Sequence, residues 1–147
     1  MNANALQRYL HTHIPLSSAM GVEVLEASVD RVRLAAPLAP NLNMHGTVFG
    51  GSGATLALLA AWSVVHLRLE AEGLASQLVI HHSTMDYLLP IHGSFAATAS
   101  LEAVDTSDFF TKYRRKGRAR LSLSAELTSE NAIAGRFTGE FVAISAP

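Results

Sequence analysis

The chain has 147 residues, of which 49% are hydrophobic and 16% charged; this composition fits one compact domain over residues 1–147 and excludes a disordered chain. Cysteine is absent, which excludes disulfide frameworks, cysteine zinc clusters and thiol nucleophiles. The net charge of −1 argues against a general nucleic-acid-binding surface, so we expect no nucleic-acid partner.

The first half of the chain predicts a short helix, two strands and a long helix. Residues 4–12 are predicted to form a short amphipathic helix, which Pro15 would end. The first residues lack the charged start and the apolar core of a secretory signal, so we expect a cytoplasmic protein. Residues 22–29 and 31–37 are predicted strands. The long helix is predicted over residues 50–72, with Gly73 at its C-terminal end; at 1.5 Å per residue it would extend ~33 Å.

This long helix lies in a stretch that has no charged residue between Arg33 and Arg68. Its mainly apolar segment, residues 54–67, contains a threonine, a serine and a histidine. This segment is also shorter than the ~20 residues that a bilayer span needs. A helix that is apolar all round and too short to span is normally buried in protein. We therefore expect no membrane insertion.

The second half alternates apolar and polar residues with period two, which is typical of half-buried strands. The predicted strands cover residues 78–89, 95–101 and 118–128, followed by a last strand that carries Ile133, Phe137 and Phe141 on one face. Residues 129–131 have the length of a hairpin connection between the last two strands.

Strands that are grouped after one long helix predict an antiparallel α+β sheet, because βαβ units would alternate helices and strands. A helix that is apolar all round needs a sheet curved around it, and Gly135 and Gly139 in the last strand permit such a bend. We therefore predict a hot-dog fold: a curved antiparallel sheet wrapped around one long central helix, with a short N-terminal helix. The open sheet edge and the apolar excess predict a homodimer or homotetramer.

The segment 41–53, which leads into the long helix, is the densest cluster of candidate functional residues. Four glycines within eight residues would let a ligand approach the backbone, and the unpaired N–H groups of a first helical turn form an oxyanion site. Gly50 and Gly51 are thus candidate donors to a thioester carbonyl. The alternative is that the glycines only serve a tight turn and close packing of the helix on the sheet.

Three segments, residues 43–51, residues 86–91 with Gly93, and residues 117–120, resemble the acyl-thioester hydrolases of the hot-dog fold in their order and spacing. The resemblance is most specific to the thioesterase domain that also occurs fused behind an acetyltransferase domain in some bacteria. It implies hydrolysis of acyl-CoA or acyl-carrier-protein thioesters in fatty acid metabolism. It also implies that no separate cofactor is needed, because coenzyme A or phosphopantetheine is part of the substrate.

The motif of related thioesterases, Asn-x-x-Gly-Thr-x-His-Gly-Gly, is matched here by Asn43, Gly46, Thr47, Gly50 and Gly51. Phe49 stands in place of the histidine, and Leu58 occupies the usual position of the catalytic acid, two turns into the helix. The resemblance therefore implies that Asn43 polarises the substrate or positions water, with Gly50 or Gly51 as the oxyanion donor and Phe49 at the substrate. It supports recognition of a thioester more than its hydrolysis.

Three further residues are candidates for the same site. Ser52 lies in a near match to the Gly-x-Ser-x-Gly nucleophile motif, but the chain is too short for the large α/β sheet of those enzymes, so we expect Ser52 to make local first-turn contacts. His45 is either a catalytic base or a plain loop residue. Asp86 is more typical of a solvated or subunit-interface carboxylate, although the pair of His45 and Asp86 is what a hydroxyacyl-thioester dehydratase would need.

No metal site is predicted. His81 and His82 are adjacent on a predicted strand and would point to opposite faces, and the His-Glu-x-x-His motif is absent. With Phe49 and Leu58 in the acid–base positions, a second function stays open: a non-catalytic module that binds acyl thioesters or a carrier protein.

Basic residues are concentrated between positions 112 and 120, which hold six of the eleven. One interpretation is a solvated hairpin loop. The other is a docking patch for the phosphates of coenzyme A or for an acidic acyl carrier protein, in which Arg114, Arg115, Lys116 and Arg118 contact the substrate.

Overall fold

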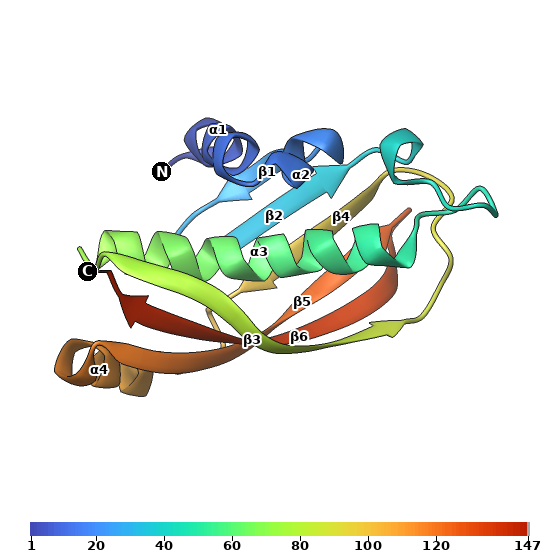
Figure 1. Cartoon of the computed structure of the whole chain (residues 1–147). Helices are drawn as coiled ribbons and strands as arrows, with labels where there is room; N and C mark the ends of the chain where they lie inside the picture. The colour runs from blue at the N-terminus through green and yellow to red at the C-terminus, as the bar shows by residue number, and fades with distance from the viewer. Residues whose placement is uncertain (147) are drawn as a thin grey trace.

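The computed structural model describes residues 1–146 and has one six-stranded antiparallel sheet that curves around a long helix (Figure 1). The helices are α1 (Ala3–His13), α2 (Pro15–Ala19), the 3-10 turn η1 (Ala39–Asn41), α3 (Gly50–Ala71) and α4 (Ser107–Lys116). The strands are β1 (Glu23–Ala27), β2 (Arg31–Ala36), β3 (Ser76–Tyr87), β4 (Phe95–Ser100), β5 (Arg118–Ser129) and β6 (Ala132–Ser145). Their order in the sheet, β1-β2-β4-β5-β6-β3, and the central α3 confirm the predicted hot-dog fold.

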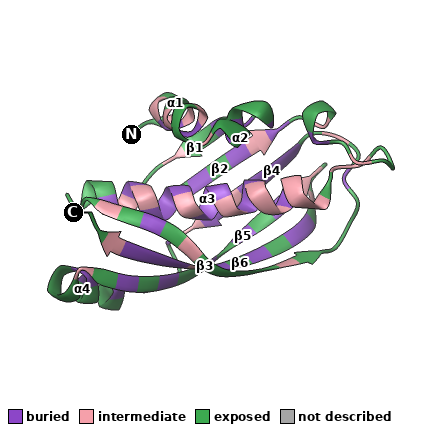
Figure 2. Cartoon of the chain, in the orientation of Figure 1, coloured by how far each residue is buried: buried purple, intermediate pink, exposed green. Residues whose placement is uncertain are grey.

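Helix α3 is the centre of the core. It contacts β2, β4 and β5, and its buried residues include Leu56, Val64 and Leu69, all at most 1% exposed. By length and composition this helix would also be able to cross a membrane, but here it is the buried core helix of the fold. A half-buried stripe, formed by Ala54, Leu58, Trp62 and His66, runs along its outer side (Figure 2).

The concave face of the sheet depends on a glycine in β6. A Cβ atom at Gly139 would lie 2.7 Å from Cε1 of Phe137 and 2.9 Å from Cε2 of Phe141, and both rings are buried. The missing side chain therefore lets two aromatic rings close over the strand. Ile133 was expected on the same face; it is instead 37% exposed, because the register of β5 with β6 shifts beside Leu127.

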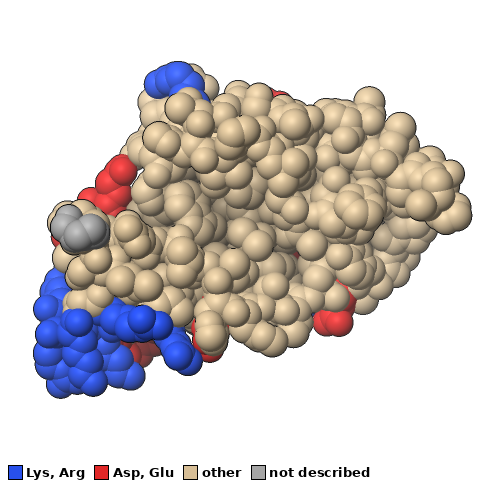
Figure 3. Space-filling view, viewed as in Figure 1, with Lys and Arg blue, Asp and Glu red and all other residues tan. Residues whose placement is uncertain are grey.

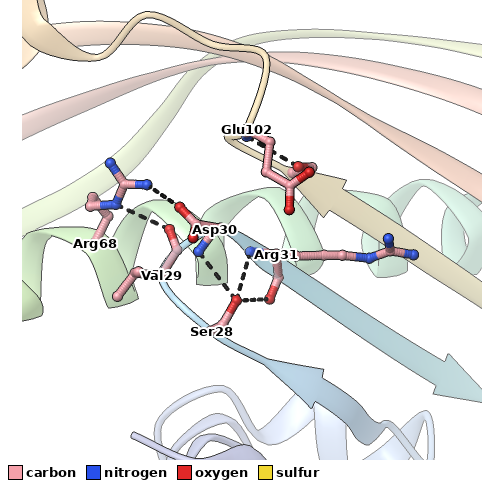
Figure 4. Close-up of polar contacts among 7 residues, drawn as sticks. Ser28, Val29, Asp30, Arg31, Arg68 and Glu102 are labelled. Carbon is pink, nitrogen blue, oxygen red and sulfur yellow. Dashed lines mark hydrogen bonds and ion pairs between the residues drawn. The ribbon is translucent and has the colours of Figure 1, made fainter.

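The C-terminal end of α3 is hydrogen-bonded to the turn between β1 and β2 (Figure 4). Arg68 Nη2 donates to Asp30 Oδ1 at 2.6 Å, and Arg68 Nε donates to the Val29 carbonyl at 3.1 Å. Ser28 Oγ accepts from the N–H groups of Asp30 and Arg31 and so closes the turn itself. An arginine in the last turn is also favourable for the helix dipole.

The two edges of the sheet differ. At one edge α1 packs beside β1, where Gln7 Oε1 accepts the Val24 N–H at 2.9 Å and His11 Nε2 lies 2.7 Å from the Val22 carbonyl. At the other edge, β3 pairs with β6 on one side and with no strand of residues 1–146 on the other. A long strand with an uncovered edge is a surface for pairing with another chain.

Two sequence-based interpretations need correction in the helical segments. Pro15 does not end the helical region but begins α2, where a proline suits the first helical position because it needs no N–H there. The basic segment is not a hairpin loop, because residues 107–116 form α4. Its Phe109, Phe110 and Tyr113 are buried, and Gly117 ends the helix with a positive φ of 70°.

A bulge in β3 breaks the alternation on which the opposite orientation of His81 and His82 was based. The pairing with β6 shifts between Ile80 and His82, and both histidines are exposed. His81 Nε2 lies 3.8 Å from a carboxylate oxygen of Glu140, whose Cα is the register partner of His82. Both side chains thus belong to the outer, polar face of the sheet.

Aromatic stacking attaches α1 to α3. The rings of Trp62 and His66 stack with centroids 4.7 Å apart, and Tyr9 stacks on His66 at 5.0 Å. His66 Nε2 is buried and has no hydrogen-bond partner within residues 1–146. Burial lowers the pKa of His66, while the Glu70 carboxylate, 3.9 Å away, acts in the opposite direction.

We predict that His66 lowers the stability of the fold in acid. Its pKa is lower in the folded chain than in the unfolded one, so the unfolded chain takes up the proton first, and stability present above about pH 6.5 is lost as the pH falls. His66→Phe keeps the stacking and removes the titration. Urea unfolding between about pH 7.5 and about pH 5.5 should show a larger loss for the wild type than for the variant. Equal losses would contradict the role of His66.

Candidate functional site

An apolar pocket lies at the start of α3. It has a volume of about 280 Å³, and we call it the inner pocket. Its walls are held by backbone hydrogen bonds: the Val48 N–H donates to the Ile91 carbonyl at 2.9 Å, and the N–H groups of Leu88 and Leu89 donate to Ala134 at 2.8 and 3.2 Å. It is lined by Val48, Phe49, Gly50, Gly53, Tyr87, Leu88, Leu89, Pro90, Ile91, Leu127 and Ala134.

The first turn of α3 provides unpaired donors at this pocket. Phe49 is the residue before the helix, and its carbonyl accepts the N–H groups of Ser52 and Gly53 at 2.9 and 3.2 Å. The N–H groups of Gly50 and Gly51 donate to no other group of residues 1–146. Because the helix dipole is positive at this end, these two amides suit a partial negative charge on a carbonyl oxygen.

Tyr87 is a polar residue of the pocket that the sequence analysis did not assign to the site. Its hydroxyl donates to the Gly50 carbonyl at 2.9 Å, which ties the end of β3 to the start of α3. Tyr87 belongs to the segment 86–91 that carries the resemblance, but its proximity to Gly50, 37 residues away in the chain, follows only from the fold. The hydroxyl and the Gly50 amide are thus two polar groups near the pocket.

A second cavity lies on the other side of Phe49. It has a volume of about 300 Å³, and we call it the outer groove. A Cβ atom at Gly51 would overlap Cε2 of Phe49 and lie 2.9 Å from its Cζ, so the ring rests against the bare backbone of Gly51. The groove is lined by Leu16, Ala19, Met20, Pro40, Asn41, Phe49, Gly51, Ser52 and Thr55.

Asn43 organises the loop that precedes α3. Its Oδ1 accepts the N–H groups of His45 and Thr47 at 2.8 and 3.1 Å, and its Nδ2 donates to the Thr47 hydroxyl at 2.8 Å. Asn43 lines neither the inner pocket nor the outer groove. Within one chain its amide is therefore used to fold the loop, and its catalytic role stays a prediction.

His45 and Asp86 are not brought together within residues 1–146. His45 is exposed on the loop, and no hydrogen bond or ion pair connects its side chain to Asp86. Asp86 is exposed on β3 and directly precedes Tyr87, so strand alternation directs it to the face of the sheet away from the pocket. No carboxylate of the described residues lines either cavity.

The basic segment, residues 112–120, lies at the opposite end of α3 from Gly50, where Figure 3 shows the large blue patch. We define the basic cluster as Lys112, Arg114, Arg115, Lys116, Arg118 and Arg120, all on α4 and the start of β5. Arg114 pairs with Glu72, just beyond α3, at 2.7 Å. Since α3 has 22 residues, the cluster and Gly50 are separated by about the length of the helix, roughly 33 Å.

Metal ligands do not converge in the described part of the chain. No group of three His, Asp or Glu side chains among residues 1–146 is arranged as a metal site would require. Among residues 1–146, His66 forms an ion-pair contact with one carboxylate, Glu70, and His81 with one, Glu140.

Comparison with known proteins gives a family match and several similar structures. Residues 3–145 match the family described as "Putative thioesterase (yiiD_Cterm)". A protein of unknown function from Chlorobaculum tepidum is 30% identical with a TM-score of 0.90, over 98% of this chain and 94% of that one. A structure described as a putative thioesterase from Shewanella oneidensis is 26% identical with a TM-score of 0.86, over 97% and 96% of the two chains. A Haemophilus influenzae thioesterase, 15% identical with a TM-score of 0.78 over 99% and 92%, shares the fold.

We predict that Asn43→Ala loosens the loop whereas Asn43→Asp does not. Aspartate keeps an acceptor oxygen for the His45 and Thr47 N–H groups, and alanine removes it. Losing such a bond costs about 1 kcal/mol, so the amide hydrogens of His45 and Thr47 should exchange several-fold faster in the alanine variant. Hydrogen exchange followed by NMR measures this. Unchanged exchange in Asn43→Ala would show that the loop does not need the side chain.

Proposed function

We propose, on the premise that this chain belongs to the family described as "Putative thioesterase (yiiD_Cterm)", that it hydrolyses acyl thioesters of coenzyme A or of an acyl carrier protein. One observation carries the proposal: an apolar pocket adjoins the unpaired N–H of Gly50 at the positive end of a 22-residue helix. An acyl chain needs the first feature and a carbonyl oxygen that becomes negative needs the second.

The proposed reaction uses the helix start to stabilise charge. Water adds to the thioester carbon while the carbonyl oxygen accepts the N–H of Gly50 or Gly51, and the carbon–sulfur bond then breaks. The water proton passes to the departing sulfur, so the products are a carboxylic acid and a free thiol. Coenzyme A or phosphopantetheine enters only as part of the substrate, and the absence of a separate cofactor and the cytoplasmic address stay predictions.

A non-catalytic binding module is the second candidate function. The observation that favours it is that no carboxylate of residues 1–146 lines either cavity, with Phe49 and Leu58 in the acid–base positions of related enzymes. Measuring the release of free thiol from acyl-CoA substrates of increasing chain length distinguishes the two functions. Tight binding of acyl-CoA without release of thiol would identify the protein as a non-catalytic binding module. The dehydratase alternative loses support because Asp86 faces away from the pocket.

The proposal includes a homodimer or homotetramer in which each copy completes the site of the other. At the C-terminal end of β3, the Tyr87 hydroxyl is hydrogen-bonded to the Gly50 carbonyl. The N-terminal end of β3 lies beside α4, where the Tyr113 hydroxyl donates to the Ala75 carbonyl at 2.7 Å. Antiparallel pairing of two β3 edges would bring the Tyr87 end of one copy to the α4 end of the other. The basic cluster of one copy would then bind the phosphates of a substrate held by its partner.

We predict that Gly50→Pro abolishes most hydrolysis and leaves the fold intact. Proline removes the proposed donor, yet it suits the first helical position, and Phe49, with φ −57° and ψ 132°, already has the conformation of a residue before proline. Loss of one oxyanion donor should lower kcat by about 10²–10³-fold.

Gly50→Ala is the matched control for this variant. It keeps the N–H and adds a Cβ 3.4 Å from the nearest ring carbons of Tyr87, an ordinary contact. Activity should therefore stay within a few-fold of the wild type. Equal activity of Gly50→Pro and Gly50→Ala, with unchanged thermal unfolding, would show that this amide does not bind the oxyanion.

We predict that the double variant Arg115→Glu, Lys116→Glu raises KM for acyl-CoA several-fold. Both side chains are exposed and form no ion pair within residues 1–146, so the substitutions leave no charge of the fold unpaired. Acyl-N-acetylcysteamine, which has no phosphate, should be hydrolysed as before, and added salt should reduce the difference for acyl-CoA. The double variant Arg8→Glu, Arg136→Glu has the same net charge and is the control; an equal effect there would contradict a local role of the basic cluster.

A further inference from the structure

Phe49 separates the two cavities at the start of α3. Its ring lines both the inner pocket and the outer groove, and its side chain is 56% exposed although it is large and apolar. It rests on the backbone of Gly51, where any side chain would collide with it. Gly50 lines the inner pocket and Gly51 lines the outer groove, and neither amide has a partner within residues 1–146.

The inner pocket matches an apolar chain. Its lining comes from Leu88, Leu89, Ile91 and Leu127 and from other residues without charged groups. The pocket reaches past Gly53, whose missing side chain leaves the space in front of Leu127 open; a Cβ there would lie 3.0 Å from Leu127 Cδ2. An occupant without polar atoms along its length would gain most from this lining.

The outer groove offers hydrogen-bonding groups along its length. The Thr55 hydroxyl donates to the Gly51 carbonyl at 2.7 Å and keeps its acceptor lone pairs, and the Ser52 hydroxyl has no hydrogen bond within residues 1–146. Asn41 is only 2% exposed; its Nδ2 donates to the carbonyls of Met20 and Pro37, but its Oδ1 has no partner among the described residues. A buried acceptor without a donor costs stability unless a ligand or water supplies one.

We infer that an acyl thioester lies across Phe49, with its acyl chain in the inner pocket and its pantetheine arm in the outer groove. The inference rests on the proposed function and adds the orientation of the substrate. The arm carries two amide groups, which supply N–H donors and carbonyl acceptors of the kind that Asn41, Ser52 and Thr55 can meet. The thioester carbonyl, between the two halves, then lies at the amides of Gly50 and Gly51.

The first half of the test changes the inner pocket. Leu89 is 52% exposed and lines this pocket, so Leu89→Trp fills it without disturbing the core. The probes are S-alkyl-CoA thioethers, which cannot be hydrolysed, with binding measured by calorimetry. Wild-type affinity should rise about fourfold for each added methylene until the pocket is full. In Leu89→Trp the rise should stop at a shorter chain; Leu25→Trp, at an exposed leucine of β1 that lines neither cavity, should match the wild type.

The second half changes the outer groove. Ala19 and Ser18 are exposed neighbours on α2, and only Ala19 lines the groove. Ala19→Leu should reduce, by about tenfold, the advantage of an S-alkyl-pantetheine over the shorter S-alkyl-N-acetylcysteamine. The dependence on alkyl length should not change. Ser18→Leu is the matched control and should retain the wild-type advantage.

These outcomes separate the orientation from the hydrolysis. If wild-type protein releases no thiol from any acyl thioester but shows both binding patterns, the proposed hydrolase is wrong and the orientation holds. If Ala19→Leu shortens the accepted alkyl chain and Leu89→Trp affects the pantetheine arm, the substrate lies the other way round and the inference is overturned. It is also overturned if Leu89→Trp and Ala19→Leu both behave like their controls.

Discussion

The burial of α3 is the constraint on which the rest of this structure depends. A 22-residue helix with apolar side chains on nearly every side is stable in water only if other elements enclose it, and here the curved sheet does so. A helix enclosed along its length still has to begin somewhere, and its first N–H groups cannot be paired within the helix. The fold therefore leaves the Gly50 and Gly51 amides without a partner among residues 1–146, beside the inner pocket and the outer groove respectively.

Phe49 shapes the local geometry of this site. The motif resemblance implies a histidine at the position of Phe49, and the Phe49 ring uses the space that Gly51 leaves free. An aromatic ring at this position forms a wall between two cavities. Position 49 thus contributes an apolar surface to both cavities, and the Gly50 and Gly51 amides follow it directly in the chain.

Much of the fold was predictable because periodicity reports burial directly. The alternation along β5 and the largely apolar pattern on all sides of α3 are consequences of facing a core, so they predicted these elements well. Helix α4 was missed because its charged residues hide three buried aromatics, and the spacing of Phe109 and Tyr113 with Gly117 after them was the available signal. Contacts between distant segments were not predictable from the sequence. No local pattern indicates that the Tyr87 hydroxyl donates to the Gly50 carbonyl, or that the Asn43 side-chain amide forms hydrogen bonds within its own loop.

The unequal edges of the sheet set a limit on self-assembly. Helix α1 packs beside β1, where Gln7 already accepts the Val24 N–H, so within residues 1–146 the long edge of β3 is the better placed of the two to receive a new strand. Two copies joined there by a two-fold axis would each use their single open flank, and no further copy could extend the joined sheet. Association through backbone pairing would then end at a closed pair, which protects a strongly apolar chain from growing into fibres.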